Sequence, residues 1–167
     1  RPRRGRAGPG ARRNGEALRA LLPGIAGYDF VSSPLSRARA TMEIVRAAMG
    51  LDPGAYRIDP ALIEITFGAW EGITLHELAA TGPAEVARRI ADKWGYVPPG
   101  GESYAMLRRR IAAWQDGLSR DTVAVSHGAV LRIVSGRLFG TPDAEIPLLP
   151  APQDKVLVAK GREARWV

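Results

Sequence analysis

Histidine is scarce in this sequence, and one of its two copies stands where chemistry is plausible. His127 follows the apolar run Thr122–Val125 and precedes Gly128, after which a helical pattern begins. Ligands collect at the carboxyl ends of the strands in parallel sheets. The N–H groups that open a helix offer unpaired donors and partial positive charge to an anion, and glycine lets the backbone approach it. The pattern therefore indicates an anion site, and a histidine satisfied at an ordinary turn is the alternative.

A second junction between a strand and a helix carries an arginine. Residues 28–32 form a short apolar and aromatic run, and Arg37 falls in about the first turn of the helix that follows. A cation is unfavourable there because the helix dipole is positive at that end. Arg37 is easier to explain if it faces an anion, because its planar fork fits two phosphate oxygens. A solvent-facing arginine is the plainer alternative.

Two acidic residues stand in stretches rich in glycine and aromatic residues. Glu64 is flanked by apolar residues within 62–72, where partial burial would raise its pKa and let it donate a proton. An amphipathic strand with one polar face would explain it equally well. Glu102 follows Pro99–Gly101 near the start of a helix, where capping is the simplest account.

The elements that must position these residues alternate along the chain. We expect helices over residues 16–22, 34–49, 83–94, 102–118 and 128–138, and a short helix whose capping box is Thr74 with Glu77. We expect strands over residues 28–32, 57–58, 122–125, 147–150, 155–159 and 164–167, while residues 62–65 fit either a strand or a loop. This alternation predicts an α/β fold in which helices cover both faces of a mostly parallel sheet.

Composition limits the possible classes of function. The chain has 167 residues, enough for one domain, and 46% of them are apolar. The absence of cysteine excludes disulfides and thiol chemistry, and two histidines argue against a zinc site. No apolar run is long enough for a membrane span. With no recognisable secretory signal, we expect a cytoplasmic protein.

The net charge of +7 belongs to the first 13 residues. They contain six arginines and no acid, and the rest of the chain has 18 basic against 17 acidic residues. This composition predicts a disordered tail over residues 1–13 and a domain over residues 14–167. It argues against a nucleic-acid-binding face, although an interaction module that acts through the tail remains an alternative.

Four stretches, taken in order, resemble the histidine phosphatase superfamily. They are SSPLSRARAT at 32–41, LIEITFGAWEG at 62–72, PGGES at 99–103 and VAVSHGAVLRIV at 123–134. The second and third are closer in form to the small cobalamin-pathway and broad-specificity phosphatases than to the glycolytic mutases. The resemblance implies a phosphoglycerate mutase-like three-layer sandwich. It also implies a small phosphorylated metabolite or inorganic phosphate as partner, with no metal or organic cofactor.

The resemblance also implies roles for individual residues. His127 would bind the transferring phosphoryl group and stabilise its charge, and Glu64 would donate a proton to the leaving oxygen. The residues that would contact the substrate are Arg37, which clamps the phosphate, together with Ser33, Glu102 and Gly128. Chemistry in the family passes through a phosphohistidine, which divides hydrolysis into two easier steps.

The family's nucleophile has no counterpart in these residues. It is the histidine of an Arg-His-Gly motif that ends the first, interior strand. Neither that strand nor that motif is present, and His76 lies outside every family motif. We therefore expect a phosphomonoester hydrolase by descent that is inactive as it stands. The alternatives are a pseudoenzyme that binds phosphate or a phosphorylated ligand without turnover, and a phosphoglycerate mutase-type phosphotransferase.

The loss of an interior strand would also affect folding. Unpaired strand edges and a gap in the core predict a marginal, aggregation-prone domain. A shifted reading frame or a wrong start over residues 1–13 is one hypothesis for the loss, and a genuine degenerate paralogue is its rival.

Overall fold

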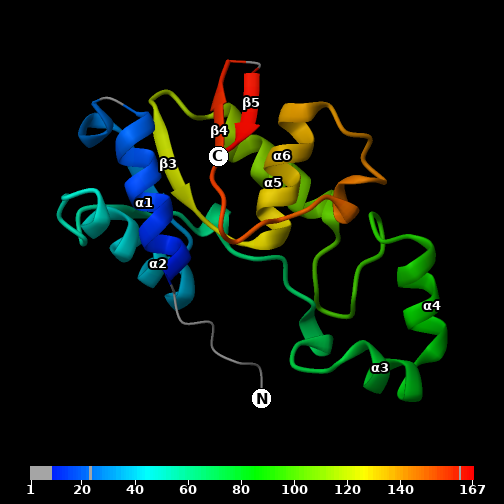
Figure 1. Cartoon of the computed structure of the whole chain (residues 1–167). Helices are drawn as coiled ribbons and strands as arrows, with labels where there is room; N and C mark the ends of the chain where they lie inside the picture. Colours follow the sequence, from blue (N-terminus) through cyan, green and yellow to red (C-terminus); the bar gives the residue numbers. More distant parts are fainter. Residues whose placement is uncertain (1–8, 23, 162) are drawn as a thin grey trace.

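The computed structural model describes residues 9–22, 24–161 and 163–167 (Figure 1). The helices of this part are α1 (Pro9–Leu21), α2 (Ser36–Ala48), α3 (Leu75–Thr81), α4 (Pro83–Ala91), α5 (Tyr104–Asp116) and α6 (Gly128–Phe139). Its strands are β1 (Asp29–Ser32), β2 (Arg57–Ile58), β3 (Thr122–Val125), β4 (Leu157–Lys160) and β5 (Glu163–Trp166). None of the helices described is both long enough and apolar enough to cross a membrane.

Three parallel strands form the central sheet, in the order β2-β1-β3. In the pairing of β1 with β3, Phe30 lies opposite Val123 and Ser32 lies opposite Val125. β4 and β5 form a separate antiparallel hairpin. The predicted mostly parallel sheet is confirmed, and within the described residues β3 is an edge strand.

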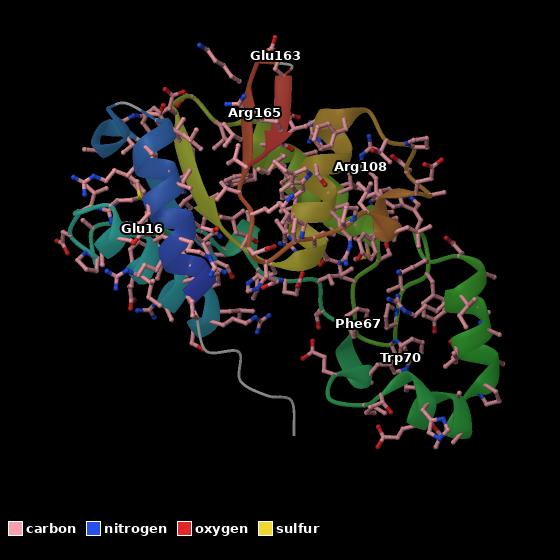
Figure 2. The ribbon with its side chains drawn as sticks, viewed as in Figure 1. Glu16, Phe67, Trp70, Arg108, Glu163 and Arg165 are labelled. Carbon is pink, nitrogen blue, oxygen red and sulfur yellow. The ribbon has the colours of Figure 1, made fainter. Side chains whose placement is uncertain are left out.

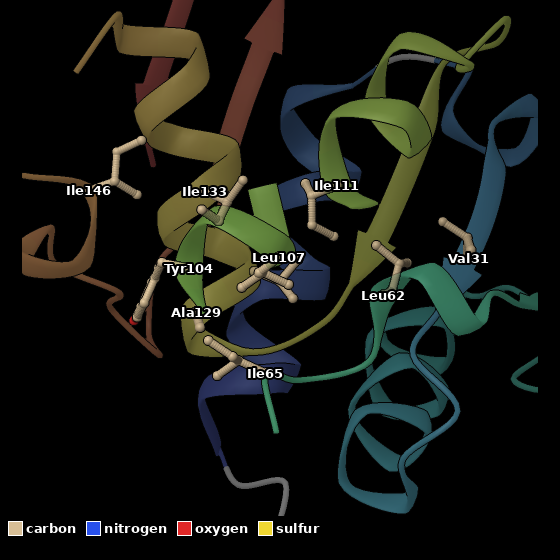
Figure 3. Close-up of a cluster of buried hydrophobic side chains, with 10 residues drawn as sticks. Val31, Leu62, Ile65, Tyr104, Leu107, Ile111, Ala129, Ile133 and Ile146 are labelled. Carbon is tan, nitrogen blue, oxygen red and sulfur yellow. The ribbon is translucent and has the colours of Figure 1, made fainter. Parts of the chain in front are cut away.

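Helices cover both faces of this sheet, because successive residues of a strand point to opposite sides. Phe30 packs into a core shared with α1 and α2, whereas Val31 packs into a second core shared with α5 and α6. Figure 3 shows the second core, in which Leu107, Ile111 and Ile133 are fully buried. Burial of each such side chain contributes about 1.5–3 kcal/mol. The predicted three-layer α/β architecture is confirmed.

Helix α1 begins inside the segment whose composition predicts disorder. Residues 9–13 are helical, and proline suits the first position of a helix because its missing N–H would be unpaired there anyway. Ala11 is buried in the core shared with α2. Gly15 permits a close approach, since a Cβ at that position would lie 2.6 Å from the carbonyl oxygen of Val45. Residues 9–13 thus belong to the folded domain, and residues 1–8 lie outside the described residues.

The remaining elements lie near their predicted positions, with one exception. A 3₁₀ turn at Ile146–Leu148 replaces the strand predicted over residues 147–150. Pro147 and Pro150 cannot donate to a ladder, and Ile146 is fully buried beside α6. Residues 62–65 form the end of a short turn and irregular backbone rather than a strand. α3 and α4 stand out from the layers as an arm (Figure 1), and the predicted capping box at Thr74 is present.

Candidate functional site

Two junctions between a strand and a helix meet at the carboxyl edge of the sheet. β1 ends four residues before α2 opens at Ser36, and β3 ends three residues before α6 opens at Gly128. Because β1 and β3 are parallel neighbours, these two helix starts lie close together. Neither helix has an acidic residue in its first turn or a side-chain hydrogen bond from its own N-cap residue. The positive end of α2 is therefore available to an anion, whereas a carboxylate from another segment, described below, lies at the start of α6.

His127 lies at the centre of this edge. Its Nδ1 accepts a hydrogen bond from Nε of Arg37 at 3.2 Å, and its Nε2 lies 2.7 Å from Oγ of Ser33. Arginine can only donate, so Nδ1 is unprotonated and the ring proton resides on Nε2, which donates to Ser33. The structure thus brings three predicted site residues into one chain of hydrogen bonds.

The imidazole of His127 is neutral in this arrangement. Only 8% of the residue is exposed. Burial, and secondarily the Arg37 guanidinium, lower the pKa of His127 from 6.5 to about 4. An anion held beside Arg37 would raise the pKa of His127, because a negative charge favours the protonated ring.

Ser33 holds the imidazole in place and does not face solvent. The residue is fully buried, and its Oγ also accepts a hydrogen bond from the backbone N–H of Leu35 at 3.3 Å. Ser33 therefore fixes the orientation of His127 relative to the junction before α2. Its direct contact with substrate stays a prediction.

Arg37 leaves most of its guanidinium accessible. The residue is exposed on the first turn of α2, and its Nε is engaged by His127. Within the described residues, no carboxylate lies close enough to form an ion pair with it. The two terminal nitrogens can therefore bind two oxygens of one phosphoryl group.

Glu64 occupies the start of α6. Its Oε1 accepts hydrogen bonds from the N–H groups of Ala129 at 3.2 Å and Ile65 at 3.1 Å. Burial raises the pKa of Glu64, while these donors and Arg37 oppose the rise. The N–H groups that open α6 were expected to receive a ligand anion, but the side chain of Glu64 takes the one of Ala129. A half-buried carboxyl with a raised pKa suits a proton donor.

Glu102 is engaged in a structural ion pair. Its carboxylate accepts from Arg110 at 2.8 Å and 3.3 Å, and Arg110 also donates to the carbonyl oxygens of Ala61 and Ile63 at 2.5 Å and 3.0 Å. The pair thereby fastens the backbone that leads into Glu64. The cap of α5 is Ser103 and not Glu102, because the Ser103 hydroxyl accepts from the N–H of Met106. The role of Glu102 at the pocket edge stays a prediction.

The two glycine-rich motifs form one unit. The N–H of Ala69 donates to the carbonyl of Pro99, and the N–H of Glu102 donates to the carbonyl of Thr66, both at 2.9 Å. Gly68 has a φ of +56°, and a Cβ there would lie 2.3 Å from the Pro99 oxygen. Only glycine permits this close approach, which fixes the two loops against each other.

Sequence reasoning missed a group of cations around Tyr104. We call Arg89, Lys93, Tyr104 and Arg132 the Tyr104 cluster. Burial lowers the pKa of Lys93, and the guanidinium groups of Arg132 and Arg89 lower it further. Burial raises the pKa of Tyr104, while Arg132 and Arg89 oppose the rise. Within the described residues none of the three cations forms an ion pair with a carboxylate, so their charge is available to a ligand.

The Tyr104 cluster adjoins the start of α6. A Cβ on Gly128 would lie 3.5 Å from Nη1 of Arg132, and Glu64 is near enough to influence the pKa of Tyr104. Nε of Arg132 donates to the carbonyl of Leu149 at 2.7 Å, and Lys93 donates to the carbonyl of Pro147 at 3.2 Å. The segment after α6 therefore holds these cations beside the site. Arg89 lies on α4 and Lys93 just after it, whereas Arg132 lies on α6; only Arg132, one turn beyond His127, gave a signal in the sequence.

His76, the other histidine, lies apart from the site. His76 is exposed near the start of α3, on the arm. In the part of the chain that the structure describes, no three His, Cys, Asp or Glu side chains gather as metal ligands would.

The fold and the site together define an α/β domain with a candidate anion site at the carboxyl edge of a parallel sheet. The model of the histidine phosphatase superfamily (branch 1) matches residues 9–167. The chain belongs to that family, as the four sequence motifs had indicated.

Individual relatives agree with this assignment. A bifunctional protein of Mycobacterium tuberculosis is 40% identical over 106 residues, which cover 63% of this chain and 27% of that protein. The bovine 6-phosphofructo-2-kinase/fructose-2,6-bisphosphatase 1 is 32% identical over 136 residues, which cover 80% of this chain and 27% of that protein. The chain thus spans about a quarter of the length of these curated relatives.

Solved structures show the same fold. The α-ribazole phosphatase of Shigella flexneri superposes with a TM-score of 0.73 at 23% identity, over 92% of this chain and 78% of that one. A mycobacterial glucosyl-3-phosphoglycerate phosphatase in complex with VO3 superposes with a TM-score of 0.67 at 27% identity, over 95% of this chain and 80% of that one. The predicted phosphoglycerate mutase-like fold is confirmed.

Proposed function

We propose that this chain forms the phosphate-binding part of a phosphomonoester hydrolase site, and that its 167 residues alone bind a phosphorylated ligand without turning it over. The observation that supports this proposal is the hydrogen-bonded chain from Arg37 through His127 to Ser33. It holds one cationic fork and one imidazole beside two helix starts. Phosphoryl transfer depends mainly on such positioning and charge stabilisation.

Each residue has a proposed part in the reaction. The terminal nitrogens of Arg37 bind two equatorial oxygens of the phosphoryl group, and His127 contributes its charge once the bound anion has raised its pKa. Where a nucleophile attacks phosphorus and forms the new bond, Glu64, whose pKa burial raises, would give its proton to the ester oxygen as the P–O bond breaks. The departing group leaves as a neutral alcohol.

The nucleophile is the part that these residues do not supply. A histidine attacks phosphorus through an unprotonated ring nitrogen, and in His127 that nitrogen is engaged by Arg37 while the protonated one faces Ser33. His76 is on the arm. In relatives that carry an Arg-His-Gly motif, a strand beside β3 would supply the attacking histidine, and the position of β3 at the sheet edge leaves room for that pairing.

The Tyr104 cluster supports a narrower substrate class, a phosphomonoester that carries a second anionic group. Three cations without carboxylate partners among the described residues would bind that group. Two relatives point the same way, since their names contain a fructose bisphosphate and a phosphoglycerate. The second group would set the orientation of the ester above Arg37.

Hydrolysis of p-nitrophenyl phosphate by the chain, beside His127→Ala, tests the proposal. We expect no turnover above buffer from either protein, together with phosphate binding that the substitution weakens. Turnover by the chain that His127→Ala abolishes would make His127 the nucleophile and overturn the proposal. Restored turnover on adding an Arg-His-Gly strand would identify the group that is needed.

A further inference from the structure

A surface cavity opens between α5 and the far end of α6. It has a volume of about 420 Å³, and its lining consists of Arg108, Arg109, Arg137, Asp143, Trp94 and two alanines of α5. Arg137 lies nine residues beyond the start of α6, which is roughly 13 Å along a helix. Figure 2 shows Arg108 beside α6 and the segment that follows it. The cavity is therefore separate from the site around His127.

Positive charge exceeds negative charge at this cavity. Nη1 of Arg108 donates to both carboxylate oxygens of Asp143, and Nη2 of Arg137 lies 2.7 Å from Oδ1 of Asp116. Arg109 is exposed, and it forms no ion pair within the described residues. Three guanidinium groups thus share two carboxylates.

A second observation concerns Arg137 itself. Its Nη1 is buried, and it has no hydrogen-bond acceptor among the described residues. Because this nitrogen is closed to solvent, Arg137 contributes its positive charge to the cavity rather than a hydrogen bond from Nη1. The Arg108–Asp143 pair is more than two-fifths exposed on both sides, which leaves it free to exchange its partner for a ligand.

We propose that this cavity binds a small polyanion, a molecule with two or more negatively charged oxygens on adjacent groups. Guanidinium forks bind such oxygens in pairs, and Arg109 supplies a fork that no carboxylate of the described residues engages, while Arg108 and Arg137 add positive charge. Trp94 forms a wall of the cavity and stacks on Tyr104 with ring centroids 6.5 Å apart. Occupation of the cavity therefore changes the surroundings of the Trp94 indole, which provides a local signal for binding.

The test follows the indole N–H resonance of Trp94 in ¹⁵N-labelled full chain during titration with pyrophosphate. The indole resonance that is missing from the spectrum of Trp94→Phe is assigned to Trp94. The Tyr104 cluster also attracts anions, so the titration is run in the Arg132→Ala protein, which keeps the cavity intact. We expect a saturable shift that Arg109→Ala weakens about tenfold or more, equivalent to 1.4 kcal/mol. The matched control is Arg13→Ala, which removes one exposed guanidinium from α1 and leaves the shift unchanged.

The outcomes separate this site from the one around His127. A shift that does not saturate, or that Arg109→Ala and Arg13→Ala leave equally strong, overturns the proposal. If Arg132→Ala fails to fold, the comparison of Arg109→Ala with Arg13→Ala in the otherwise unaltered chain decides in the same way. Loss of phosphate binding in Arg37→Ala with an unchanged Trp94 response would show that the cavity works independently of the proposed function.

Discussion

Arg37 and His127 lie 90 residues apart in the sequence, and Nε of the first donates to Nδ1 of the second at 3.2 Å. This contact fixes the ring proton on Nε2 and holds both side chains before a ligand arrives. Groups that are already oriented need little reorganisation when a phosphoryl group binds. The contact also occupies the one ring nitrogen that could attack phosphorus, which is why we assign binding to these residues and not turnover.

The buried neutral state of His127 predicts a pH dependence of stability. Its pKa is about 4 when folded and 6.5 when exposed, so the unfolded chain binds more protons between these values. The contribution of His127 to stability is fully present above pH 6.5 and is lost as the pH falls through the folded value. We expect it to reach roughly 3 kcal/mol, at 1.36 kcal/mol per unit of pKa.

His127→Gln isolates this contribution in urea denaturation between pH 4 and pH 7. Glu64 acts in the opposite sense, because its pKa is raised and its contribution to stability falls as the pH rises. The difference between the unaltered chain and His127→Gln removes that opposing effect. A difference that stays constant across this range would show that His127 is not buried in its neutral form.

Arg132 is expected to discriminate between ligands with one and two anionic groups. Arg132→Ala should weaken the binding of 3-phosphoglycerate about tenfold, which corresponds to 1.4 kcal/mol, and should change the binding of inorganic phosphate much less. Competition titration calorimetry measures both affinities. Arg120→Ala is the control, because it removes an exposed arginine whose side-chain hydrogen bond, among the residues that the structure describes, goes to the carbonyl of Gly27. Equal losses for both ligands would refute a second anionic subsite.

Glu102 is expected to stabilise the segment before Glu64. Glu102→Ala leaves the guanidinium of Arg110 half-buried without its carboxylate, and we expect a loss of about 1–3 kcal/mol in the free energy of unfolding. Glu102→Gln, which keeps the hydrogen-bonding oxygen, should lose less. Urea denaturation measures both. If Glu102→Gln lowers the free energy of unfolding as much as Glu102→Ala does, the charge of Glu102 matters and its hydrogen bonds do not.

Much of the site follows from local sequence patterns. Arg37 and His127 each stand after an apolar run and at the start of a helical pattern, and neighbouring parallel strands bring their carboxyl ends together. The sequence could not predict that the Glu64 carboxylate would accept a hydrogen bond from the N–H of Ala129 at the start of α6, where a ligand anion was expected. That depends on the packing of an irregular segment, which has no periodicity to detect.

The Tyr104 cluster and helix α1 show the same limit. Arg89 and Lys93 lie four residues apart at the end of α4 and just after it, but only tertiary packing brings Arg132 of α6 beside them. The helical state of residues 9–13 likewise depends on the burial of Ala11 against α2, which outweighs an arginine- and glycine-rich composition. Patterns within one element are visible in a sequence, and contacts between elements are not.

The most direct test of the phosphate site is calorimetric titration of the chain with inorganic phosphate, beside Arg37→Ala and Arg39→Ala. The two arginines lie two residues apart on α2, both are exposed, and only Arg37 contacts His127. We predict saturable binding that Arg37→Ala weakens about tenfold or more, at 1.4 kcal/mol per factor of ten, and that Arg39→Ala leaves unchanged. Binding that both substitutions weaken equally, or that neither affects, would contradict a phosphate site built on Arg37 and His127.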